Sequence, residues 1–86
     1  MDFGDAIKAL KEGKKLSRNG WNGKEQYIEL VSNISFIEPN GVIINEGHAD
    51  IGNKAIAFVG TRGIQVGWLA SQADMLAEDW FIKKEN

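Results

Sequence analysis

The amino-acid sequence predicts an α+β fold, in which a small antiparallel β-sheet carries an N-terminal helix and a short helix before the last strand. Three observations lead to this prediction. Helical periodicity is confined to the start of the chain, alternating segments separated by glycine-rich turns follow it, and a helix-cap signal precedes a final apolar segment. The chain has 86 residues and no repeat or linker-like stretch, so residues 1–86 are expected to form a single domain.

Residues 2–12 are predicted to form the first helix, because Phe3, Ile7 and Leu10 recur at helical spacing. The aspartate at the start of this range is the expected N-cap, and Gly13 stands where a glycine commonly ends a helix. For Phe3, packing in the core is preferred to a position facing a ligand.

Short antiparallel strands are predicted where residues alternate or are bounded by turn residues, at 15–18, 26–32, 35–38, 42–45, 55–59, 64–68 and 80–82. Turns at Pro39-Asn40-Gly41 and at Gly60-Thr61-Arg62-Gly63 join four of these segments into two hairpins. Residues 46–54, which include His48, are rich in glycine, asparagine and aspartate, and they are expected to form a loop.

The second helix-start signal lies between Trp68 and Trp80. Ser71, followed three residues later by Asp74, is typical of an N-cap with an acidic partner in the first turn. The apolar residues 75–77 that follow predict a helix of only one to two turns. Such a short helix is not stable alone, so the sheet is expected to hold it on either side.

Composition excludes several classes of function. The formal net charge is −2, which argues against general nucleic-acid binding through phosphates. The chain has no cysteine and one histidine, which excludes disulfides and a Cys/His metal site. No signal peptide and no long apolar segment occurs, so a cytoplasmic protein that does not enter a membrane is expected.

Basic residues are concentrated in residues 1–24, which hold six of the ten lysines and arginines. The lysines of the first helix fit a solvated face, whereas Arg18 adjoins two Asn-Gly turns that flank Trp21 and is the cation expected near a ligand. The indole of Trp21 is expected either at an edge, against another chain or a planar ligand, or as a cap on the sheet.

No catalytic set is evident from the residues. Ser71, His48 and Asp74 could be written as a triad, but capping explains the serine and His48 falls in the unassigned loop. Asp74, Glu78 and Asp79 could act as acid and base or bind magnesium, but solvated helix residues are preferred, apart from Asp74 in the first turn. We therefore expect no catalytic residue, no metal and no cofactor, and a protein that is not an enzyme.

The residues instead form a recognition set suited to a small anionic nucleotide. Trp21 and Trp68 offer flat faces on which a base could stack. Backbone N–H groups at the start of the second helix, together with Arg18, could hold phosphate. The polar side chains that could pair with base edges or ribose hydroxyls are Asn22, Ser71, Gln72 and Asp74.

Three motifs carry a resemblance to a known family. They are Phe-Gly-Asp-Ala-Ile-Lys-Ala-Leu-Lys-Glu-Gly-Lys-Lys at 3–15, Arg-Asn-Gly-Trp-Asn-Gly-Lys at 18–24, and Trp-x-x-Ser-Gln-x-Asp-Met-Leu-Ala-Glu-Asp-Trp at 68–80. Together they resemble a family of small phage and bacterial proteins, the second Thoeris anti-defence family. The resemblance covers residues 2–31 and 64–82, and the middle of the chain is unmatched.

The resemblance implies a tetrameric sponge that sequesters, without degrading it, a cyclic ADP-ribose isomer that bacterial TIR-domain enzymes make as an alarm signal. It implies glycocyclic ADP-ribose as the ligand, and some members also take up cyclic dinucleotides. Where family members often have Pro-Trp, this chain has Gly67-Trp68, so the stiffness of the backbone can differ there. The positions that the resemblance implies for ligand contact are Trp21, Asn22, Gly23, Trp68, Ser71, Gln72 and Asp74.

Two further hypotheses stay open at this point. One is an enzyme that hydrolyses such a nucleotide with Asp74 or Glu78 as the base. The other is a structural or protein-interaction module without a nucleotide ligand, whose tryptophans bury a subunit interface.

Overall fold

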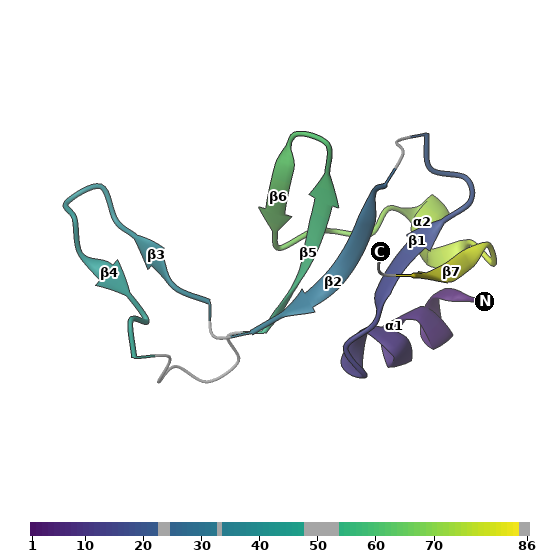
Figure 1. Cartoon of the computed structure of the whole chain (residues 1–86), viewed down its shortest axis with the longest axis horizontal. Helices are drawn as coiled ribbons and strands as arrows, with labels where there is room; N and C mark the ends of the chain where they lie inside the picture. Colours follow the sequence, from purple (N-terminus) through teal and green to yellow (C-terminus); the bar gives the residue numbers. More distant parts are fainter. Residues whose placement is uncertain (23–24, 33, 48–53, 85–86) are drawn as a thin grey trace.

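The computed structural model describes residues 1–22, 25–32, 34–47 and 54–84 (Figure 1). In chain order its elements are α1 (Phe3–Lys11), β1 (Lys15–Arg18), β2 (Tyr27–Val31), β3 (Phe36–Ile37), β4 (Ile43–Ile44), β5 (Ala55–Gly60), β6 (Gly63–Val66), α2 (Gln72–Leu76) and β7 (Trp80–Lys83). The predicted α+β class is confirmed, with the N-terminal helix and the short helix before the last strand both present.

The main sheet has five strands in the order β6-β5-β2-β1-β7, and each neighbouring pair is antiparallel. The first strand therefore lies between β2 and the last strand, with Leu16 paired to Ile28 on one side and to Ile82 on the other. The start of the chain is held against the last strand as well, because the N-terminal amino group of Met1 donates to the backbone oxygen of Trp80 at 2.8 Å.

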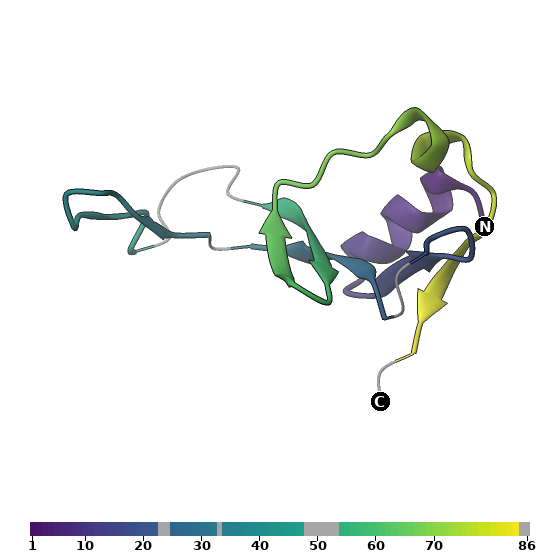
Figure 2. The same cartoon turned by 90° about the horizontal axis from the view of Figure 1, so that it is seen from above.

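The ends of α1 follow the sequence signals. The carboxylate of Asp2 accepts a hydrogen bond from the backbone N–H of Asp5 at 2.8 Å, which confirms the predicted N-cap. Gly13 has a φ of +89°, the left-handed conformation with which glycine commonly follows a helix. Figure 2 shows that the helix lies on one side of the sheet.

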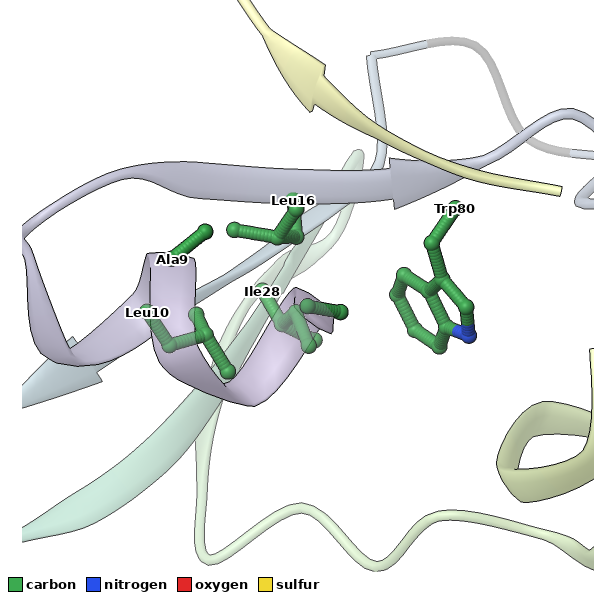
Figure 3. Packing of buried hydrophobic residues seen from close by; sticks show 6 residues of the cluster. Ala9, Leu10, Leu16, Ile28 and Trp80 are labelled. Atoms are coloured by element: carbon green, nitrogen blue, oxygen red, sulfur yellow. The ribbon is translucent and has the colours of Figure 1, made fainter. Parts of the chain in front are cut away.

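This side of the sheet carries the hydrophobic core (Figure 3). Leu10 from α1, Leu16 and Ile28 from the centre of the sheet, and Trp80 from β7 are buried together. The ring of Phe3 packs against them, with its centroid 5.5 Å from that of Trp80, so the expected core position of Phe3 is confirmed.

The opposite side of the sheet exposes several apolar side chains and remains open. Side chains alternate along a strand, so the residues next to those of the core point to this second face. Among them, Ile64 is 66%, Val66 50% and Phe81 38% exposed. We call this surface the open face; among the described residues, no helix packs on it.

The β3–β4 hairpin projects from the main body, and we call residues 36–44 the arm (Figures 1 and 2). The predicted hairpin is confirmed, although its strands are shorter than expected, with Phe36 paired to Ile44. The radius of gyration of the Cα atoms is 14.4 Å, whereas a compact domain of this length has about 12 Å. On the arm, Phe36 is 57% and Ile37 70% exposed, so this elongated part of the molecule carries apolar surface.

The other predicted strands agree with the observed ones to within a few residues, except at the end of β6. This strand ends at Val66 because the chain turns out of the sheet at Gly67, which has a φ of +83°. The backbone N–H groups of Gly67 and Trp68 both donate to the carbonyl of Ile56, each at 3.0 Å. Trp68 is thereby placed over the core side of the sheet and outside a strand.

Two further expectations concern the loop and the membrane. Most of the predicted loop at 46–54, including His48, lies outside the described residues. Within the parts of the chain that the structure describes, neither helix has the length and hydrophobicity needed to cross a membrane.

Replacing Leu16 by alanine is expected to destabilise the protein strongly, since Leu16 is fully buried between α1 and the central strands. The cost of such a cavity is about 2–5 kcal/mol in the free energy of unfolding. Leu69→Ala is the matched control, because Leu69 is 88% exposed and its truncation should change that free energy by no more than about 0.5 kcal/mol. Urea unfolding measures the free energy of unfolding of both variants. If Leu16→Ala and Leu69→Ala lose the same amount, Leu16 is not part of the core.

Candidate functional site

The short helix α2 begins with the predicted cap. The backbone N–H of Asp74 donates to the Ser71 hydroxyl at 3.0 Å, and the backbone N–H of Ser71 donates to Asp74 Oδ2 at 3.1 Å. This reciprocal capping box confirms the helix-start signal. It also gives these two backbone donors partners inside the protein.

Asp74 connects α2 to the sheet. Its Oδ1 atom accepts hydrogen bonds from Arg18 Nη1 at 2.8 Å and from Trp21 Nε1 at 3.1 Å. Its backbone carbonyl accepts a hydrogen bond from the indole N–H of Trp80 at 3.0 Å. With only 8% of its surface exposed, Asp74 joins the end of β1, the turn after it and the start of β7.

Two guanidinium nitrogens of Arg18 bind protein carboxylates. Its Nε atom donates to Asp79 Oδ1 at 2.8 Å, while Nη1 binds Asp74, and its side chain is only 16% exposed. The other oxygen of Asp79 accepts the backbone N–H of Gly20 at 2.8 Å. The sequence analysis treated Asp79 as a solvated residue, and the structure corrects this: Asp79 fixes both Arg18 and the turn before Trp21.

These contacts set the charge of the cluster. Burial acts to raise the pKa of Asp74, but hydrogen bonds from Arg18, Ser71 and Trp21 outweigh it and hold this pKa below the ordinary aspartate value. The hydrogen bond from Arg18 likewise lowers the pKa of Asp79, and the two carboxylates raise the pKa of Arg18. At neutral pH one cation therefore lies between two carboxylates, for a local charge of about −1.

The apolar side chains of α2 contribute less than the sequence suggested. Met75 is 41% and Leu76 78% exposed, so the helix does not bury an apolar stripe. Its attachment to the sheet depends instead on Asp74, whose side chain and carbonyl make the contacts described above.

Beside this cluster, four aromatic rings pack edge to face and face to face. The ring of Trp21 lies 5.4 Å from Phe58, 6.1 Å from Trp68 and 5.3 Å from Trp80, in each case at a steep angle. Phe58 and Trp68 are nearly parallel, at 22° and 6.5 Å. Edge-to-face and offset geometries are the favoured ones for aromatic pairs, so these walls are rigidly held.

A cavity of about 300 Å³ opens between these rings and the carboxylate cluster. It is lined by Trp21, Asn22, Gln26, Phe58, Trp68 and Asp74, and we call it the aromatic pocket. Four of these were predicted to contact a ligand. Gln26 and Phe58 were missed, because the sequence shows them only as ordinary residues at the start and in the middle of strands.

The remaining predicted site residues are placed as follows. Arg18 and Ser71 lie behind the pocket as partners of Asp74 and do not line it. Gln72 is exposed on α2 and is likewise absent from the lining. Gly23 lies outside the described residues. The assignment of these residues to ligand contact stays a prediction.

The chemistry of the pocket is that of recognition. Flat rings, two carboxamides and one anionic carboxylate can stack a heterocycle and pair with its edges. The hydroxyl of Ser71 is occupied as the helix cap, and in the described part of the chain no three carboxylate or imidazole groups converge as metal ligands.

Comparisons with known proteins point to one family. Residues 1–83 match the Thoeris anti-defense 2-like domain. The protein Thoeris anti-defense 2 of Bacillus phage SP01 is 38% identical over 85 residues, which cover 95% of this chain and 93% of the relative. The match therefore includes the middle of the chain, which the sequence analysis left unmatched.

Asp74→Asn is expected to destabilise the protein at pH 7 by about 2–4 kcal/mol, because it removes the charge that binds Arg18 and replaces one of the two acceptor oxygens by an NH2 group. Either the indole N–H of Trp21 or the backbone N–H of Ser71 then loses its acceptor. The pKa of Asp74 is lowered by folding, so its contribution is complete above the unfolded value of about 4 and is lost as the pH falls through lower values. The difference in the free energy of unfolding between wild type and Asp74→Asn should therefore become smaller as the pH is lowered.

Urea unfolding at neutral pH and below pH 4 would test this, with Glu78→Gln as a control of equal charge change at an exposed position. A gap of the same size at both pH values would show that the charge of Asp74 does not stabilise the fold.

Proposed function

Since this chain belongs to the Thoeris anti-defense 2-like family, we propose that it acts against Thoeris defence as a non-enzymatic sponge for a cyclic ADP-ribose isomer. The ligand proposed is glycocyclic ADP-ribose made by bacterial TIR enzymes, which the protein would sequester in the cytoplasm of the infected host cell. The observation that carries this proposal is the aromatic pocket, in which Trp21, Phe58 and Trp68 surround an opening with amide and carboxylate groups at its rim.

The pocket suits the purine and ribose parts of such a ligand. Its volume of about 300 Å³ lies at the lower end of the range for small-molecule sites. Stacking of a base on an aromatic side chain contributes about 1–3 kcal/mol, and the amides of Asn22 and Gln26 can both donate and accept at a base edge. Asp74 can accept from a ribose hydroxyl.

The low pKa of Asp74 and the hydrogen bonding of Ser71 favour sequestration without hydrolysis. A general base works best with a pKa near the working pH, whereas the pKa of Asp74 is held below its ordinary value by Arg18. Ser71 is committed to the helix cap. The residues at the pocket therefore support tight binding better than proton transfer.

A homo-oligomer, as a tetramer, forms part of the proposal. Two apolar surfaces support it: the open face of the sheet and the arm, both of which expose large hydrophobic side chains. Exposed large hydrophobic side chains gathered on one surface commonly mark a protein interface. A small core also gains stability when such surfaces are buried between subunits.

Trp68→Ala is expected to abolish capture of glycocyclic ADP-ribose, because it removes one stacking wall of the pocket. Purified protein would be mixed with products of an activated TIR enzyme, freed of unbound ligand and heated, and the released molecules identified by mass spectrometry. Intact ligand from wild type and Trp68→Phe, but not from Trp68→Ala, is the expected result.

Three other results would count against the proposal. Altered ligand would indicate an enzyme. Capture of cyclic dinucleotides in a separate incubation, without capture of the TIR product, would indicate a sponge for that class of signal. An empty fraction with no nucleotide-dependent rise in melting temperature would leave an interaction module.

Phe36→Asp is expected to lower the oligomeric state, because it places a charge on the exposed apolar surface of the arm. Leu69→Asp makes a comparable change at a residue that is 88% exposed and lies away from the arm, and it should leave the assembly intact. Light scattering after size exclusion measures both. If Phe36→Asp assembles like wild type, the arm is not part of the interface.

A further inference from the structure

Among the residues that the structure describes, none supplies the aromatic pocket with a free cation for the phosphates of the proposed ligand. Arg18 was the cation expected there, but its guanidinium is held by Asp74 and Asp79, each at 2.8 Å. One cation between two carboxylates leaves a local charge of about −1, which disfavours a pyrophosphate at that place. A ligand whose base stacks in the aromatic pocket must therefore carry its phosphates elsewhere.

A second cavity adjoins the aromatic pocket and has the opposite charge. It has a volume of about 420 Å³ and is lined by Gln26, Phe58 and the turn and strand from Gly60 to Gln65. Gln26 and Phe58 line both cavities, so the two openings are neighbours along the same wall. Among the described residues that line the second cavity there is no carboxylate, and the charged one is Arg62.

Arg62 differs from Arg18 in being available. It is exposed at the tip of the β5–β6 hairpin, and it forms no ion pair with the residues that the structure describes. An arginine guanidinium presents several N–H donors in a planar fork, which suits the oxygens of a phosphate.

The register of the sheet places the groups around Arg62 on the side that carries the core. Phe58 pairs with Gln65 and with Ile28, so the Gln65 side chain emerges on the same face as the buried Ile28. In the next row Gly60 pairs with Gly63, and neither carries a side chain. Because these two glycines have no side chains, a ligand can approach the backbone closely between the amides of Gln26 and Gln65.

Gly60 allows the ring of Phe58 to lie close to the backbone. A Cβ atom at Gly60 would lie 3.1 Å from Phe58 Cε1, so the ring would have to shift by a few tenths of an ångström. The ring of Phe58 can thus lie along the backbone at Gly60 while its other side faces Trp21 and Trp68.

We propose that the β5–β6 turn is the phosphate-holding part of the site, with Arg62 as the cation and Thr61 and Gln65 as hydrogen-bond donors. A nucleotide would lie across Phe58, its base in the aromatic pocket and its pyrophosphate at the turn. This inference rests on the proposed function, and it assigns to Arg62 the part that the sequence suggested for Arg18.

The test compares Arg62→Gln with wild type in the binding of glycocyclic ADP-ribose, by calorimetry at low and at high sodium chloride concentration. Loss of a charged hydrogen-bond partner is expected to weaken binding about 10- to 100-fold at low salt. The difference should shrink at high salt, since screening weakens the contact of the wild-type protein. Arg62→Lys should restore part of the loss.

Lys11→Gln is the matched control, because it makes the same charge change at an exposed residue of α1 and should bind as wild type does. Tryptophan fluorescence at saturating ligand should respond alike in Arg62→Gln and wild type, since the base still stacks.

Two outcomes overturn the inference, and they are distinguishable. If wild type binds glycocyclic ADP-ribose and Arg62→Gln binds it equally well, the role of Arg62 alone is refuted. The same conclusion follows if Arg62→Gln binds more weakly than wild type by the same factor at all salt concentrations. Wild type that binds no glycocyclic ADP-ribose refutes the proposed function and this assignment with it.

Discussion

The carboxylate of Asp74 is the contact on which the arrangement of the pocket depends. A five-residue helix cannot persist alone in water, and α2 buries little apolar surface of its own. Asp74 instead fastens it to Arg18 on β1 and to the indole of Trp21, while its carbonyl receives Trp80. Asp74 thus positions the ring of Trp21 through its carboxylate and that of Trp80 through its backbone carbonyl, and its low pKa keeps the carboxylate charged at neutral pH.

The same arrangement explains why the core side of the sheet carries the helices and the aromatic pocket, whereas the open face carries neither. A sheet this small can bury only a modest core, and α1 covers just one end of it. The uncovered end of the core side is completed by aromatic rings, of which Trp80 belongs to the core and Trp68 to the cavity wall. Trp21, Phe58 and Trp68 all pack against the core and also line the cavity, so the wall of the pocket is continuous with the core.

Local features were predictable from sequence, and long-range pairing was not. The helix caps at Asp2 and Ser71, like the hairpin turns, depend on contacts between residues that are close in sequence. The spacing of these residues therefore predicts the contact. The position of β7 beside β1 brings Asp79 next to Arg18, 61 residues away, and nothing in the local pattern indicates it. The same limit hid Phe58, since its place in the pocket follows from the order of the strands.

The resemblance noted from the sequence implies Pro-Trp where this chain has Gly67-Trp68, and the backbone at this point affects the pocket. A proline there would have φ near −65° and no backbone N–H. In this chain Gly67 has a φ of +83°, and its N–H donates to Ile56 at 3.0 Å. Neither feature is compatible with proline, so a relative with Pro-Trp must leave the sheet by another path. The turn at Gly67 sets where the indole of Trp68 lies, nearly parallel to the ring of Phe58 at 22°. Under the proposed function, the backbone at Gly67 can therefore alter ligand selectivity while all side chains that line the pocket stay the same.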